Sequence, residues 1–320
     1  MGGNGRTAPR VGATFLPDGW SAVEPRRRQA LLDRLYQAGV GHMVVADHLT
    51  FRNGWGCDGM VAAGDVLAAH HSLGAYISVY LLALRHPVAV ARQVVTLSQY
   101  HPGRLVVGVG VGGDDRREVE AAGVDPATRG RRTDEALAVL RALLSGQAVT
   151  HSGEFFSLDE VRVLPAPRPP VPLIVGGRAD ASLRRAARLG DGYVGLWMSP
   201  DRLADALGQV DALAAEAGRE PVDWRHGITL WCGFGRDVAE ARRHAGVAVE
   251  EIYGIPFETF ERWVPCGPPE VVAERVAAYS RAGATTVNLV PQAGNVEAGV
   301  EAVAAVADLL RTKGSDTCPV

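Results

Sequence analysis

HMVVADHL, residues 42–49, is a run of apolar, strand-forming residues that ends in an acid and an imidazole, Asp47 and His48. Buried parallel strands have nearly continuous hydrophobic sequences of this kind. In a (β/α)8 barrel, the residues at the carboxyl ends of the strands face the catalytic mouth. The stretch therefore indicates a barrel strand that ends in functional residues, although a backbone hydrogen bond that caps the strand or the following loop would explain His48 as well.

Similar apolar runs recur along the chain and alternate with helical patterns. They cover residues 11–16, 75–82, 104–111, 172–177, 191–197, 226–234 and 285–291. Together with the first stretch they make eight strands, which favours parallel pairing through helical crossovers and closure into a (β/α)8 barrel. We predict an α/β fold, a (β/α)8 TIM barrel with insertions, as a single domain over residues 1–320, with frayed ends at about 1–9 and 312–320.

A doubly wound open sheet is the alternative fold. Its dinucleotide-binding turn would follow the first strand as Gly-x-Gly-x-x-Gly, but PDGW, residues 17–20, follows that strand here. Two segments interrupt the regular repeat: 149–170 alternates like a hairpin and ends in prolines, and 251–267 is rich in aromatic residues. We expect both to be insertions on the active-site side. The aromatic residues of the second would line a substrate pocket, form a subunit contact or pack the loop against the barrel.

The composition argues against several classes of function. The 320 residues include 33 basic and 36 acidic ones, a net charge of −3, so there is no basic field to bind nucleic acid or an anionic membrane. The four cysteines lie far apart, without a Cys-x-x-Cys pair, so we expect neither a metal site nor a disulfide framework. Without a signal-like start or about 18 uninterrupted apolar residues, we expect a soluble, cytoplasmic protein.

Two glycine clusters follow predicted strands. In VVGVGVGGDD the glycines are at positions 108, 110, 112 and 113, where missing side chains would let a flat ring or a polyol chain lie against the backbone. Tight packing inside the barrel would explain Gly108 and Gly110, but not the later pair.

The second cluster is Gly176-Gly177-Arg178, and a helix can begin just after it, at Asp180 or Ser182. Backbone N–H groups at a helix N-terminus and a guanidinium together favour a phosphate, although Arg178 could instead pair with a neighbouring acid. With Asp47 and His48 at another strand end, this cluster suggests one phosphate-bearing cofactor at the barrel mouth.

These residues identify the chain as similar to the luciferase-like flavin-dependent oxidoreductases, and to their branch that uses the deazaflavin coenzyme F420. The resemblance runs from about residue 10 to 312. It is carried by the segments 44–49, 84–115, 128–146 and 169–197. It implies a barrel with a flavin or deazaflavin at its mouth, its phosphate on the 176–178 turn and its ring near Asp47, His48 and the third strand.

The resemblance also implies further site residues. The family often has a non-proline cis peptide behind the ring, which would fall at Ile77-Ser78 or Ser78-Val79 here. The cofactor contacts that it implies are therefore Asp47, His48, Ser78, Val79, Gly110, Val111, Gly112, Gly113, Gly176, Gly177 and Arg178. Some relatives carry a glutamate just after the fourth-strand glycines. The corresponding position here is Gly113, followed by Asp114, so a second catalytic acid is not assigned.

We therefore expect an oxidoreductase that transfers a hydride between coenzyme F420 and a small organic substrate, and the resemblance implies a homodimer. His48 and Asp47 would be the catalytic residues: the imidazole would move the proton, and Asp47 would fix its tautomer or bond the cofactor. One alternative is an FMN-dependent monooxygenase, since both cofactors share the ring, the ribityl chain and the first phosphate. The other is a non-catalytic flavin-binding protein.

Overall fold

The computed structural model describes residues 8–52, 54–112, 115–219 and 221–315. Eight parallel strands form a closed barrel in the order β1-β12-β11-β10-β9-β6-β5-β2. The strands are β1 (Arg10–Ala13), β2 (His42–Val45), β5 (Gly74–Leu81), β6 (Leu105–Gly110), β9 (Leu173–Gly176), β10 (Gly192–Leu196), β11 (Gly227–Gly233) and β12 (Thr286–Gln292). The bounds of each strand agree with those of a predicted apolar run to within a few residues. The predicted (β/α)8 barrel is confirmed.

Two antiparallel hairpins lie outside the barrel. They are β3 (His48–Phe51) with β4 (Trp55–Cys57), and β7 (Val149–Ser152) with β8 (Ser157–Val161). The helices are α1 (Pro17–Ala22), α2 (Pro25–Gln37), α3 (Gly59–Ala69), α4 (Pro87–Tyr100), α5 (Arg116–Ala121), α6 (Arg129–Leu144), α7 (Asp180–Leu189), α8 (Pro200–Glu216), α9 (Val238–Tyr253), α10 (Pro269–Arg281) and α11 (Val296–Ser315), with 3-10 turns η1 (Leu82–Leu84), η2 (Phe257–Thr259) and η3 (Glu261–Trp263). The chain is thus helical up to Ser315, beyond the predicted start of the frayed end at 312.

The chain packs as two compact units. The first comprises residues 1–43, 195–207 and 225–320, and the second comprises residues 44–194 and 208–224. The second unit contains the carboxyl end of β2 and all of β5, β6 and β9. Every predicted cofactor residue therefore belongs to the second unit. A single domain over residues 1–320 stays a prediction.

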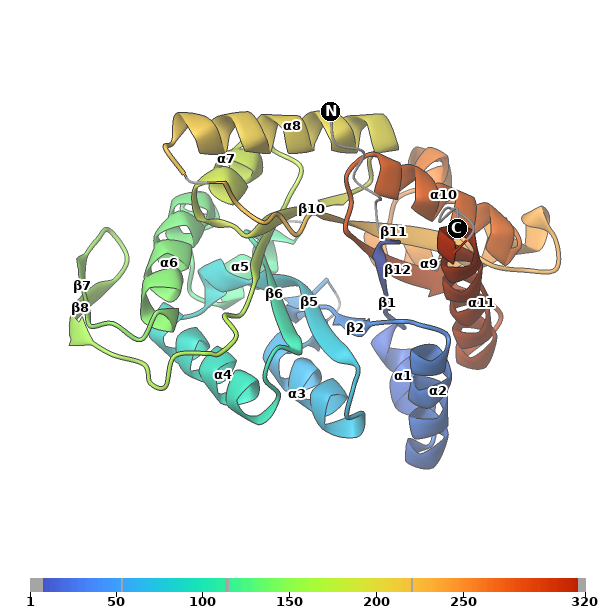
Figure 1. Ribbon diagram of the computed structural model, residues 1–320, viewed down its shortest axis with the longest axis horizontal. Coiled ribbons are helices and arrows are strands. Elements are labelled where there is room, and N and C mark those ends of the chain that lie inside the picture. The colour runs from blue at the N-terminus through green and yellow to red at the C-terminus, as the bar shows by residue number, and fades with distance from the viewer. Residues whose placement is uncertain (1–7, 53, 113–114, 220, 316–320) are drawn as a thin grey trace. The chain divides into compact units, whose positions relative to one another are not determined.

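In the second unit, local sequence signals begin the helices that follow the strands. The Asp58 carboxylate accepts hydrogen bonds from the N–H groups of Met60 and Val61, which starts α3. The His86 ring caps α4 in the same way, and Pro87 occupies its first position. Figure 1 shows α3 and α4 beside β5 and β6, and their buried apolar faces cover this part of the sheet. These helices cover the outer face of the sheet, so the site is expected at the carboxyl ends of the strands.

The 149–170 insertion contains a hairpin, as predicted, but only part of it lies on the side where the active site was expected. It connects the end of α6 to the start of β9, at the opposite end from the strand carboxyl ends. Its tip folds back along α6, where the Glu135 carboxylate accepts hydrogen bonds from the N–H groups of Phe155 and Phe156 at 3.0 Å and 2.8 Å. The Phe156 ring also meets His86 at the start of α4. Only the tip therefore reaches the side on which the active site was expected.

The 251–267 insertion lies in the first unit, beside the carboxyl end of β11. The N–H of Gly233 donates to the Pro265 carbonyl at 3.0 Å. Phe257 and Phe260 are buried in a cluster that includes Trp197 and Trp231. These two aromatic residues therefore pack the loop against strand ends, which confirms the packing alternative for them.

Within the described residues, no helix combines the length and the apolar character needed to cross a membrane. The same residues contain no group of three or more His, Cys, Asp or Glu side chains able to hold a metal ion.

A buried histidine lies in the first unit, on β2. His42 Nε2 is 2.8 Å from Asn288 Oδ1, and Gly12 leaves room for the ring, since a Cβ there would overlap it. Burial lowers the pKa of His42 from 6.5 to about 4. Below pH 6.5 the unfolded chain therefore binds a proton that the folded protein does not, and stability decreases as the pH falls toward 4.

We predict that the free energy of unfolding falls between pH 7 and pH 5 by about 2 kcal/mol from His42 alone. Urea denaturation at the two pH values measures the change. His42→Gln retains a hydrogen-bonding side chain but cannot take up the proton, so its pH dependence should be smaller by that amount. An unchanged pH dependence in His42→Gln would contradict the assignment.

Candidate active site

The predicted site residues lie toward the carboxyl ends of four neighbouring strands of the second unit, in the order β2-β5-β6-β9. Asp47 and His48 follow β2, and the glycine loop follows β6. The others are Ser78 and Val79 near the end of β5, and Gly176, Gly177 and Arg178 at the end of β9. Gly113, together with Asp114, lies outside the described residues. The structure therefore brings the four sets of residues to one edge of the sheet.

Asp47 is completely buried, and its carboxylate makes four hydrogen bonds. Arg85 donates to both oxygens, at 2.7 Å and 2.8 Å, and the N–H groups of Gly59 and Leu81 donate at 2.9 Å and 2.8 Å. Burial raises the pKa of Asp47, and Arg85 and the two backbone donors oppose this change. The carboxylate therefore joins three elements, β2, α3 and β5. The expectation that it fixes the tautomer of His48 is wrong, because its bonds go to these other groups.

His48 has a different acidic partner, Glu118 on α5. His48 Nδ1 is 3.0 Å from Glu118 Oε2, and the N–H of Leu49 donates to Oε1 at 2.6 Å. The Glu118 side chain is 2% exposed and that of His48 is 26% exposed. The imidazole also packs against Phe51, with ring centroids 4.5 Å apart.

Sequence reasoning missed Glu118, because 70 residues separate it from His48. The one available signal is its position shortly after the fourth-strand glycines, where some relatives carry a glutamate. The resemblance directed that comparison to Gly113, five residues earlier, and the contact of Glu118 with the imidazole depends on where α5 lies against β3.

The peptide between Ser78 and Val79 is cis, the second of the two predicted positions. The Val79 side chain lies over glycines of β6, the neighbouring strand, and of β9, the strand beyond it. A Cβ on Gly176 would lie 2.7 Å from Val79 Cγ1, and one on Gly110 would overlap Val79 Cγ2. A Cβ on Gly108 would overlap the Ile77 carbonyl oxygen. Packing therefore explains Gly108 and Gly110: the space that we expected a ring to use at Gly110 is filled by Val79, which is itself only half-buried.

The Gly176-Gly177-Arg178 turn stands between the end of β9 and the start of α7. Gly177 has φ of +140°, and its carbonyl accepts a hydrogen bond from the Tyr193 hydroxyl at 2.6 Å. Helix α7 begins at Asp180 after Ala179, whose side chain cannot cap the first N–H groups; the N–H of Ser182 donates to the Ala179 carbonyl at 2.8 Å. Arg178 is exposed beside them. These N–H groups and the guanidinium can receive an anionic group.

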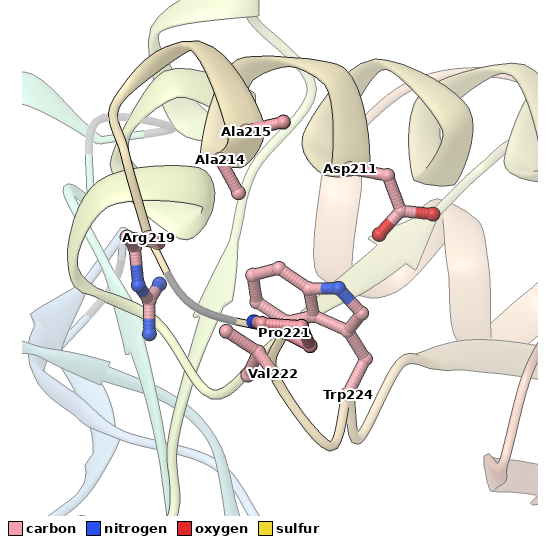
Figure 2. A pocket seen from close by; sticks show the side chains of 7 residues that line it. All are labelled: Asp211, Ala214, Ala215, Arg219, Pro221, Val222 and Trp224. Atoms are coloured by element: carbon pink, nitrogen blue, oxygen red, sulfur yellow. The ribbon is translucent and has the colours of Figure 1, made fainter.

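A separate hollow of about 300 Å³ lies between α8 and the residues Arg219, Pro221, Val222 and Trp224 (Figure 2). Its lining residues are Asp211, Ala214, Ala215, Arg219, Pro221, Val222 and Trp224. Arg219 donates to the carbonyl oxygens of Ala187 and Gly190, at 2.8 Å and 2.9 Å, at the last turn of α7. The hollow therefore lies at the end of α7 opposite Arg178, and it contains none of the predicted site residues.

We predict that Asp47→Asn lowers the free energy of unfolding by about 3–5 kcal/mol, because it leaves the Arg85 charge without its buried partner. Asp58→Asn is the matched control: its carboxylate lies 3.4 Å from Arg85 but is partly exposed, and asparagine caps a helix as well as aspartate does. Denaturant titration of both variants should show a loss of about 1 kcal/mol or less for the control. Equal losses would contradict the role given to Asp47.

Comparison with known proteins places this geometry in a family. The family model described as luciferase-like monooxygenase matches residues 11–286. An F420-dependent glucose-6-phosphate dehydrogenase of Beutenbergia cavernae is 29% identical over 279 residues, which cover 78% of this chain and 82% of that protein. An uncharacterized protein of Mycobacterium tuberculosis is 38% identical over 166 residues, or 52% of this chain, and the match spans 57% of that relative's length.

Solved structures support the fold. An F420-dependent secondary alcohol dehydrogenase, solved in complex with an F420-acetone adduct, superposes with a TM-score of 0.80 at 23% identity, covering 94% of this chain and 99% of that one. At this identity the likeness concerns the fold alone. Since the family model matches most of the chain and the barrel agrees with it, this chain belongs to the luciferase-like monooxygenase family.

Proposed function

We propose that this protein is an oxidoreductase that transfers a hydride between coenzyme F420 and a small organic substrate. The observation that carries the proposal is the meeting of four sets of residues at one sheet edge: an imidazole after β2, a valine bulge in β5, a glycine loop after β6 and an uncapped helix N-terminus after β9. Relatives over most of the chain bear the names of F420-dependent dehydrogenases, which supports this cofactor and reaction class.

The residues fit such a cofactor. Val79 offers a half-buried apolar surface on which a ring can rest, backed by Gly110 and Gly176. Ser78, Val111 and Gly112 adjoin it and are also only partly buried. At the end of β9, the N–H groups at the start of α7 and the Arg178 guanidinium suit the phosphate. An apolar support and an anion site on one sheet edge are what a ring joined to a phosphate by a ribityl chain requires.

When bound, the coenzyme accepts or donates the hydride. In the oxidation of an alcohol, the hydroxyl proton would pass to His48 Nε2 while the hydride leaves the carbon that bears the hydroxyl, and a carbonyl group forms. In the reverse direction, protonated His48 would return the proton to the oxygen. An imidazole can both accept and donate a proton, so it suits both roles. Asp47 positions His48, because its buried carboxylate holds the backbone next to the imidazole.

The FMN-dependent monooxygenase differs in how the reduced cofactor reacts, because reduced FMN activates oxygen and the deazaflavin does not. A non-catalytic flavin-binding protein would need no group placed for proton transfer. The imidazole of His48, partly exposed and held by a buried carboxylate, favours an enzyme. A homodimer, as common in the family, is likewise proposed, and light scattering of the purified protein would test it.

Cofactor titration tests the proposal directly. Quenching of cofactor fluorescence should show binding of F420 in the micromolar range and much weaker binding of FMN. Tight binding of FMN alone would support the monooxygenase instead, and binding of neither would exclude both enzymes.

We predict that Arg178→Ala weakens F420 binding about 10- to 100-fold, because it removes a charge-assisted hydrogen bond to the phosphate. Arg188→Ala is the control. Arg188 is exposed, as Arg178 is, but it lies in the last turn of α7, whereas Arg178 precedes the first turn. The control should change the dissociation constant less than about two-fold. Equal dissociation constants for Arg178→Ala and the unsubstituted protein would exclude Arg178 from the phosphate site.

We predict that His48→Ala binds F420 normally but reduces kcat by about 10²- to 10⁴-fold, the usual contribution of general acid–base catalysis. The assay screens small alcohols against oxidised F420, and ketones or other carbonyl compounds against the reduced form, by the change in coenzyme absorbance. Undiminished turnover in the variant would show that His48 takes no part in the chemistry.

A further inference from the structure

We infer that Glu118 is a second positioning residue of the site: it fixes His48 in the tautomer that leaves Nε2 free to accept a proton. The inference rests on the proposed function, in which Nε2 exchanges a proton with the substrate. It concerns a residue of α5 that lies outside the four sets of predicted site residues but contacts His48 and the two residues that follow it.

The direction of the hydrogen bond between the two side chains follows from the other partners of Glu118. Oε1 accepts the N–H of Leu49 at 2.6 Å and that of Thr50 at 3.3 Å. Oε2 lies 3.0 Å from His48 Nδ1. A carboxylate accepts hydrogen bonds and donates none, so the hydrogen between the two side chains is on Nδ1. In the neutral imidazole, Nε2 then carries the lone pair.

No other charged side chain competes with Glu118 at the ring among the described residues. The imidazole meets the rings of Phe51 and Trp55, with centroids 4.5 Å and 6.0 Å away. Cys57 lies opposite His48 in the β3-β4 register, and the Arg52 guanidinium lies over the ring of Phe51, 5.3 Å from its centroid. Asp47, although adjacent in sequence, is bonded to Arg85. The tautomer therefore depends on Glu118.

The same carboxylate sets the position of the imidazole as well as its tautomer. Its bonds to the N–H groups of Leu49 and Thr50 hold the two residues that follow His48. The backbone before His48 is held independently by Asp47. With both neighbours held, the imidazole has little freedom to turn away, which is the condition for efficient proton transfer.

Glu118→Gln tests the inference. An amide of the same shape can still accept the N–H of Leu49 through its oxygen, but its NH₂ group then faces Nδ1 and requires a lone pair there. His48 should change to the tautomer with hydrogen on Nε2, which cannot accept a proton. We predict that kcat for alcohol oxidation falls about 10²- to 10⁴-fold, as when the orienting acid of a catalytic histidine is replaced by its amide, with KM and F420 affinity nearly unchanged.

A spectroscopic measurement separates this role from a structural one. The ¹⁵N chemical shifts of His48 in the cofactor-free protein report which ring nitrogen carries the hydrogen, and they should exchange their assignments between the unsubstituted protein and Glu118→Gln. The matched control is Asp115→Asn. Asp115 lies three residues earlier, caps α5 and accepts the N–H of Arg52 at 2.7 Å, so it also ties the β3-β4 hairpin to α5, without contacting His48.

Asp115→Asn should keep both the His48 tautomer and kcat. An unchanged tautomer in Glu118→Gln, or an equal loss of kcat in the two variants, would overturn the inference, since only a general loosening of the hairpin would then remain. The tautomer is measured without cofactor or substrate. Failure of F420 binding with an exchanged tautomer would therefore reject the proposed function and leave the role of Glu118 intact.

Discussion

The buried Asp47 carboxylate is the interaction on which the site depends most. Its four hydrogen bonds join the end of β2 to the start of α3 and to β5, so three elements meet at one group immediately before His48. Removing a carboxylate and a guanidinium from water is costly, and a buried pair of this kind adds little net stability compared with apolar residues. The pair instead fixes geometry. Each hydrogen bond of Asp47 has one partner and one direction, and together these bonds fix the backbone from which the His48 imidazole projects.

A second constraint acts through volume. Val79 projects over neighbouring strands and can do so only because Gly110 and Gly176 have no side chains. The glycines thus shape the mouth indirectly, by admitting a valine that then presents the apolar surface. The hydrogen bonds of Asp47 at the end of β2 and the packing of Val79 of β5 over β6 together support the carboxyl end of the sheet in the second unit. Rigid support of this sort is what a cofactor and a proton-transfer group require to meet in a fixed arrangement.

The sequence was sufficient for the fold and for much of the site, for a physical reason. The strands are short apolar runs, and residues that follow parallel strands must gather at their carboxyl ends, so Asp47, His48 and Gly176-Gly177-Arg178 could be placed without coordinates. Glu118 could not, because its contact with His48 arises from the tertiary packing of the short helix α5 against β3. The sequence also did not show that Arg85 is the partner of Asp47, because Arg85 follows a different strand. The 149–170 hairpin was recognised by its alternation, but only tertiary packing against α6 directs its tip.

A crystal structure of the protein with coenzyme F420 tests the central claim most directly. We expect the ring to rest against Val79 with His48 beside it, and the phosphate to bind the N–H groups that begin α7, next to Arg178. Density for the coenzyme at any other place, such as the hollow around Trp224, would contradict the account.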